Sequence, residues 1–87
     1  MNLEKLRVEI DKIDIKLLHL LRRRMKITCK IGKEKKKVSR NILDFTREKE
    51  IGENWQVQAF KLGLQRNFVL KILGIIFAES KRIQKYD

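Results

Sequence analysis

The feature that most constrains this 87-residue chain is an uninterrupted helical pattern at its beginning. From about Leu3 to about Lys36 there is no proline, and the first glycine is Gly32. At ~1.5 Å per residue, a helix of some 33 residues is roughly 50 Å long. A compact globule of this chain length has a radius of gyration of only about 12 Å. Apolar residues recur on one face of this helix: they are Leu3, Leu6, Ile10, Ile13, Leu17, Leu20 and Leu21. This stripe is too long for one chain to cover, and a second copy is the simplest partner, so we expect an intertwined homodimer.

Two shorter helical segments follow the first. The stretch 36–41 is expected to be a loop, and a second helix is expected to begin near Asp44 or Thr46, since both residues are good N-caps. Gly63 is a natural residue after the end of that helix, and Asn67 is a candidate N-cap for the third. The inward faces are expected to hold Ile51, Trp55, Ala59 and Leu62 in the second helix and Val69, Leu73, Ile76, Phe77 and Ile83 in the third. The sequence therefore predicts an all-α fold of three helices, forming one domain over residues 1–87.

The chain is strongly basic, with 22 lysines and arginines against 11 acidic residues and a net charge of +11. Such an excess attracts nucleic acid, an anionic membrane surface or a small polycarboxylate. No apolar run approaches the length of a membrane span, and the charges spaced along the N-terminus are unlike a signal peptide. The single cysteine, Cys29, excludes an intrachain disulfide and suits a reducing compartment. We therefore expect a cytoplasmic protein.

Two cations lie on the apolar face of the first helix. With ~100° between successive residues, Arg24, Thr28, Ile31 and Lys35 fall in the same arc as the apolar stripe. One explanation is that the end of the helix is frayed and that the side chains of Arg24 and Lys35 extend along it to reach water. The other is a buried anion pocket, because unpaired cations are costly to bury and an anionic ligand would complete them.

The other two predicted helices carry groups that match such a pocket. Arg47 and Glu48 lie near the N-terminus of the second helix, whose dipole favours anions. Ser80 and Gln84 are one turn apart, on the face of the third helix that carries Ile76. Each of the four also has an ordinary explanation, as a solvated charge or a polar residue near a helix end. Together they supply a cation, neutral donors and a carboxylate to the pocket.

At this point the residues match a known family over nearly the whole chain. The segment from Leu6 to Asp14 reads L-R-x-x-I-D-x-I-D, and Arg24 and Lys35 follow it with Gly32-Lys33 between them. The segment 44–48 reads D-x-x-R-E, and the segment 80–84 reads S-x-x-x-Q. In this ordered set the chain resembles the all-α (AroQ-type) chorismate mutases.

The resemblance implies which residues hold the substrate and which act on the breaking bond. Arg24, together with Arg7 donated by the other subunit of a homodimer, would hold the two carboxylates of chorismate. Lys35 and Gln84 would donate to the ether oxygen, with Lys35 also touching a carboxylate. The helical wheel agrees on Arg7, which lies about 100° from the face of Arg24 and Lys35 and so points away from its own chain's pocket.

The remaining roles implied by the resemblance concern the ring hydroxyl and the anion pocket. Glu48, helped by the region of Asp44, would accept from the ring hydroxyl. Ser80 would contact a carboxylate, and Arg47 would support the anion pocket. Because the rearrangement of chorismate to prephenate is unimolecular and pericyclic, no nucleophile, metal or cofactor is expected.

Two other functions stay open at this point. Some proteins of the same fold are isochorismate–pyruvate lyases with a similar cationic pocket, although Glu48 favours the mutase. A basic helical module could instead bind nucleic acid through the segment 22–40. That hypothesis leaves Glu48, Ser80 and Gln84 without a function, so we expect neither nucleic acid nor a membrane as a partner.

Overall fold

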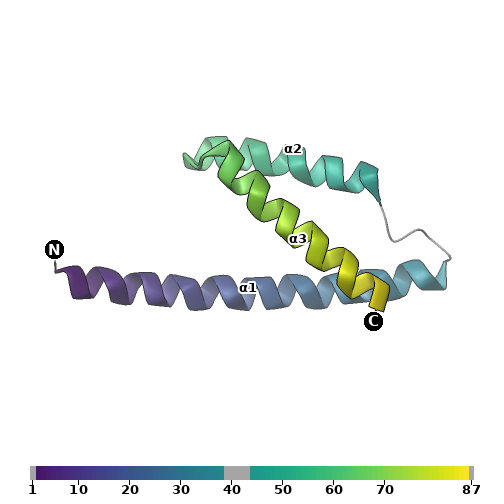
Figure 1. Ribbon diagram of the computed structural model, residues 1–87, viewed down its shortest axis with the longest axis horizontal. Coiled ribbons are helices and arrows are strands. Elements are labelled where there is room, and N and C mark those ends of the chain that lie inside the picture. Colours follow the sequence, from purple (N-terminus) through teal and green to yellow (C-terminus); the bar gives the residue numbers. More distant parts are fainter. Residues whose placement is uncertain (1, 39–43, 87) are drawn as a thin grey trace.

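The computed structural model describes residues 2–38 and 44–86, and its fold is all-α, as predicted. Three helices follow one another, α1 (Leu3–Lys37), α2 (Phe45–Leu62) and α3 (Arg66–Tyr86), and the described residues contain no strand. In Figure 1, α1 is a nearly straight rod, and α3 runs from the far end of α2 to the C-terminal part of α1. The three predicted helices are therefore confirmed.

The first helix is as long as its sequence predicts. Asn2 caps it, since the side-chain oxygen accepts from the backbone N–H of Glu4 at 2.7 Å. Three lysines occupy the last turn, where cations interact favourably with the helix dipole. The helix ends at Lys37 and so covers the first two residues of the predicted loop 36–41, of which residues 39–41 lie outside the described residues. The molecule measures 55 Å along its longest axis.

Local signals explain the boundaries of α2 and α3, with one correction. Asp44 caps α2 by accepting from the backbone N–H of Arg47, and Gly63 ends it with a φ of 69°, a left-handed conformation that favours glycine. The predicted cap of α3, Asn67, is wrong because that residue already lies inside the helix. Gln65 takes this place: its side-chain oxygen accepts from the N–H of Phe68 at 3.0 Å.

The apolar core is small and lies along α3. The buried apolar side chains are Ala59 of α2 and Val69, Leu73 and Ile76 of α3. Leu62 was expected to point inward as well, but this last residue of α2 is 71% exposed in this chain. Helix α3 packs against both α1 and α2, whereas these two do not pack directly on each other in the part of the chain that the structure describes. Helix α3 is therefore the link that holds the other two in place.

Helix α1 buries almost none of its apolar stripe in this chain. Its buried residues are Thr28 and Gly32, while Leu6, Ile10, Ile13, Leu17 and Leu20 are between 37% and 59% exposed. The N-terminal part of α1 extends past the other two helices (Figure 1), and the radius of gyration is 16.1 Å, against about 12 Å for a compact chain of this length. None of the described helices is long and apolar enough to cross a membrane.

Candidate active site

A pocket of about 260 Å³ lies where α1 and α2 face each other across the C-terminal half of α3. This volume is near the lower end of the range for small-molecule sites. Its lining combines charged, polar and apolar side chains from all three helices: Arg24, Ile27, Thr28, Ile31, Lys35, Asp44, Arg47, Glu48, Ile51, Phe77, Ser80, Lys81 and Gln84. The pocket is therefore suited to a small polar molecule with an apolar part.

One wall of the pocket is the C-terminal part of α1. Arg24 and Lys35 are half-buried there, and Thr28 between them is buried. The guanidinium of Arg24 donates from Nη1 to Oγ of Ser80 at 3.3 Å, which fixes its direction across the pocket. Burial, and in addition the nearby charge of Arg47, lowers the pKa of Arg24. Both effects disfavour the charged form, so an anion entering the pocket would relieve them.

The opposite wall is the first turn of α2. Because Asp44 accepts from the backbone N–H of Arg47 at 3.0 Å, the helix begins at the mouth of the pocket and its N-terminal dipole points there. The next residue, Glu48, lines the pocket with a side chain that is 26% exposed. The guanidinium of Arg47 pairs with Glu50 on the exposed side of the helix at 3.3 Å. This turn thus brings a cation and two carboxylates to the pocket.

The floor of the pocket is α3, which contributes two buried polar residues to the site. Ser80 and Gln84 are each 8% exposed, although both are polar. Gln84 fits against Gly32 of α1: a Cβ on that glycine would lie 3.0 Å from Cγ of Gln84 and 3.1 Å from its Cα. The side-chain Oε1 of Gln84 is buried and has no hydrogen-bond partner among the described residues. Buried polar atoms are rarely left without a partner, so this amide stands out among the polar groups of the site.

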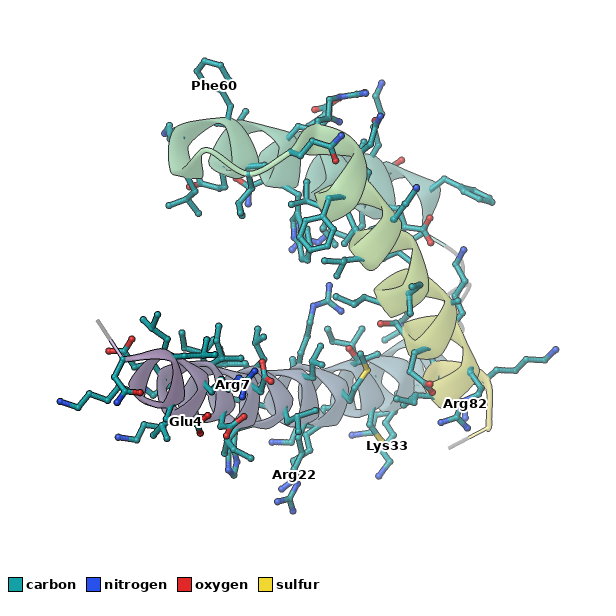
Figure 2. All side chains as sticks on the ribbon, turned by 60° about the vertical axis from the view of Figure 1, so that its left-hand side comes forward. Glu4, Arg7, Arg22, Lys33, Phe60 and Arg82 are labelled. Carbon is teal, nitrogen blue, oxygen red and sulfur yellow. The ribbon has the colours of Figure 1, made fainter. Side chains whose placement is uncertain are left out.

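The structure brings together seven of the eight residues predicted to bind substrate: Arg24, Lys35, Asp44, Arg47, Glu48, Ser80 and Gln84. It does not bring Arg7 to the same pocket. Arg7 lies near the opposite end of α1, is 65% exposed and pairs with Glu4 at 3.1 Å (Figure 2). This position agrees with the prediction that Arg7 points away from its own chain's pocket.

Sequence reasoning missed Ile27 and Lys81 of the lining, as well as the role of Gly32 beside it. Lys81 lines the pocket, and its ammonium lies 2.9 Å from Oε1 of Glu48. Its position on the helical wheel, about 60° from Gln84, could have indicated this. Gly32 was noted as the first glycine of the long helix and as part of a motif, yet its role is to provide the space that Gln84 occupies. A glycine inside a long helix, where it costs about 1 kcal/mol relative to alanine, was the available signal.

The charges of the lining define the ligand that the pocket accepts. Arg24, Lys35, Arg47 and Lys81 contribute four positive charges, and Asp44 and Glu48 contribute two negative ones, so the lining carries a net charge of +2. A small dianion would neutralise this excess. Buried neutral groups lie beside the charges and can donate to or accept from the polar atoms of such a ligand. Within residues 2–38 and 44–86, no three His, Cys, Asp or Glu side chains gather where they could hold a metal ion.

Comparison with known proteins agrees with this geometry. The model of the family described as chorismate mutase type II matches residues 6–85, which is nearly the whole chain. No curated protein and no solved structure gives a significant match. The matched segment contains every residue that lines the pocket. The chain therefore belongs to the chorismate mutase type II family, an isomerase family, and chorismate mutase activity follows from that membership.

Proposed function

We propose that the pocket between α1, α2 and α3 is the site where chorismate is rearranged to prephenate, and that the protein works as a homodimer in which each subunit donates Arg7 to the other subunit's site. The observation that carries the proposal is the convergence of seven motif residues, from three helices, on one pocket with a net charge of +2. Chorismate carries two carboxylates, so its charge matches this excess.

The reaction itself requires little chemistry from the protein. The rearrangement is intramolecular: one C–O bond breaks as one C–C bond forms, and no group is transferred to the enzyme. The protein must hold the enolpyruvyl side chain over the ring, which is an orientation effect. It must also stabilise the negative charge that develops on the ether oxygen as its bond breaks, which preorganised donors do well.

Each wall of the pocket then has a part in the reaction. Arg24 and the partner's Arg7 bind the two carboxylates, Ser80 contacts a carboxylate, and Arg47 adds positive charge. Their common task is to hold the reactive conformation.

Lys35 and Gln84 donate to the ether oxygen. The amide of Gln84 suits this task because it is buried and held against α1. Rotation of an amide by 180° exchanges its oxygen and nitrogen ends, so the buried end that lacks a partner can present N–H groups to an oxygen of the substrate. Glu48, with Asp44 nearby, accepts from the ring hydroxyl.

The exposed stripe of α1 supports the dimer. Fully burying one exposed aliphatic side chain stabilises by ~1.5–3 kcal/mol, so the five half-exposed stripe residues are worth about 1 kcal/mol each. Two chains then gain roughly 10 kcal/mol, the same order as the ~4–15 kcal/mol that association costs. Arg7 lies on the projecting part of the same helix, away from its own chain's pocket (Figure 2), and pairing of two α1 helices would carry it to the partner.

The direct test is the loss of chorismate absorbance on adding the purified protein, with prephenate identified as the product. Gln84→Ala should lose on the order of 3 kcal/mol of transition-state stabilisation, by analogy with removing one oxyanion-hole donor. The loss should fall on kcat more than on KM, because the charge on the ether oxygen develops only as the bond breaks. An unchanged kcat would contradict the role of Gln84.

A mixed dimer tests the role of Arg7. Arg7→Ala and Lys35→Ala should each be nearly inactive alone. In a heterodimer of the two, one site collects both defects and the other collects neither, so mixing under exchange should restore up to half of the wild-type sites. No recovery in demonstrated heterodimers would mean that Arg7 does not act across subunits.

We further infer that the protein works in the cytoplasm, in the biosynthesis of phenylalanine and tyrosine. Prephenate is a precursor of both amino acids, and the single cysteine suits a reducing compartment.

A further inference from the structure

The ion pair between Lys81 and Glu48 differs from the surface ion pairs of this chain. Surface pairs such as Arg7 with Glu4 join residues three positions apart on one helix, and both side chains are well exposed. Lys81 and Glu48 instead join α3 to α2, at 2.9 Å, with side chains that are 39% and 26% exposed. Both residues also line the pocket. Partial removal from water strengthens the attraction between two charges relative to a surface pair.

Glu48 poses an electrostatic problem that this pair solves. A carboxylate in the pocket can accept a hydrogen bond from a hydroxyl, but it repels a ligand with two carboxylates. Without Lys81 the net charge of the lining would fall from +2 to +1, and the carboxylate of Glu48 would face the substrate uncompensated. A carboxylate has two oxygens and about four acceptor sites, so an ammonium at Oε1 leaves capacity for a hydroxyl.

Lys81 also ties the pocket together. Its neighbour Ser80 accepts from Arg24 on α1, while Lys81 pairs with Glu48 on α2. Two adjacent residues of α3 therefore orient one cation and one anion on opposite walls, which do not otherwise pack on each other within the described residues.

We propose that Lys81 is a positioning residue for chorismate binding: it fixes the carboxylate of Glu48 and neutralises it, so that the pocket accepts a dianion and still offers an acceptor to the ring hydroxyl. This inference rests on the proposed function, since it assumes that Glu48 faces the ring hydroxyl. It adds a lysine that none of the family motifs quoted above includes.

The first test removes the charge and keeps the length of the side chain. Lys81→Met should raise KM for chorismate roughly tenfold and leave kcat within about twofold. A tenfold change lies between the small effect of removing one partner of a surface ion pair and the large effect of removing one partner of a buried pair. A contact made equally in the ground and transition states affects KM rather than kcat. Lys81→Arg keeps the charge and should restore most of the affinity. Lys71→Met, on the same helix but outside the pocket, is the matched control and should behave as wild type.

The second test asks whether Lys81 acts through Glu48. In the Glu48→Gln background there is no carboxylate to neutralise, so Lys81→Met should change KM for chorismate less than twofold. The wild type, the two single variants and the double variant form a double-mutant cycle. Measuring the binding of prephenate to these four proteins by calorimetry completes the cycle even where turnover is slow. A tenfold effect that persists in the Glu48→Gln background would mean that Lys81 binds the substrate directly, which overturns the proposal. An unchanged KM in Lys81→Met would overturn it too, whereas failure of the wild type to convert chorismate would refute the proposed function itself.

Discussion

Replacing Gly32 by alanine tests how closely α3 must approach α1 for the site to work. The new Cβ would lie 3.0 Å from Cγ of Gln84, and 3.1 Å from its Cα and its Cβ. Carbon atoms normally rest ~3.5–4.0 Å apart, so the gap is too small by about half an ångström. Since one of the three atoms belongs to the backbone, a new side-chain rotamer of Gln84 cannot resolve the clash. The last turns of α3 must move away from α1, and the amide of Gln84 moves with them.

The stability change should be small because two effects oppose each other. Alanine is better than glycine inside a helix by about 1 kcal/mol, while overpacking costs about 1–3 kcal/mol. The free energy of unfolding should therefore fall by only about 0–2 kcal/mol. The effect on catalysis has no such compensation. A misplacement of 1 Å costs about 100-fold in rate, so a shift of half that size should lower kcat by roughly tenfold.

The measurement pairs chorismate turnover with thermal unfolding followed by circular dichroism. Gly74→Ala is the matched control, since a Cβ at Gly74 of α3 meets no atom within 4 Å. It should raise Tm by several degrees, in line with about 1 kcal/mol gained in a small domain, and leave kcat unchanged. If Gly32→Ala folds and keeps kcat within twofold of wild type, the close contact between α1 and Gln84 does not position the catalytic amide, and the reasoning fails.

Three further predictions concern assembly, pH and ligand binding. Leu17→Glu should weaken the dimer at least about 100-fold, because both chains lose an apolar contact on the stripe; sedimentation velocity at micromolar concentration should then show monomers, and a persistent dimer would contradict the proposed interface. With Gln84, kcat/KM should stay nearly flat from mildly acidic to neutral pH, whereas Gln84→Glu should be active only at acidic pH, where a carboxylic acid can donate; an unchanged pH profile would argue against donation to the ether oxygen. Burial and Arg47 lower the pKa of Arg24, so the charged form of Arg24 destabilises the fold at every pH below that pKa. This destabilisation is lost only as the pH rises through the pKa. Arg47→Gln should therefore raise the Tm of the free protein and reduce the gain in Tm on adding prephenate, and equal gains for both proteins would refute this coupling.

Local signals predicted most of the fold. Apolar periodicity and the absence of breakers gave the long α1, and short-range capping by Asp44 and the left-handed Gly63 set the limits of α2. The cap of α3 was missed because Gln65 is a weaker cap by type than Asn67, yet it stands where the chain turns after Gly63. The prediction that Leu62 points inward was wrong, because a helical wheel does not indicate where α3 stops covering the inner face of α2.

The site could be predicted as far as residue types and helical faces allow. Arg24 and Lys35 share a face of α1, and Ser80 and Gln84 share a face of α3, so their presence in one pocket follows once the helices pack. The pairing of Lys81 with Glu48 could not be predicted, because it depends on the distance and rotation between α2 and α3. The position of Arg7 relative to the partner's pocket could not be predicted from helical faces either, because it depends on how two copies of the chain pack.

The arrangement in which α3 alone joins α1 and α2 also bears on how such a site can change over generations. A substitution on the α1 wall has to keep its packing against α3 but meets no packing from α2, and the reverse holds for the α2 wall; the charge of Arg47 acting on Arg24 still couples the two walls. Apart from that charge coupling, two walls that do not pack on each other can accumulate mutations separately, each altering what the pocket recognises without repacking the other. Helix α3 has less freedom, because its adjacent residues Ser80 and Lys81 contact α1 and α2 respectively, so a change that shifts this helix affects both neighbours. In a set of random variants selected for turnover of an altered substrate, accepted changes should concentrate in the walls and be rare in the floor.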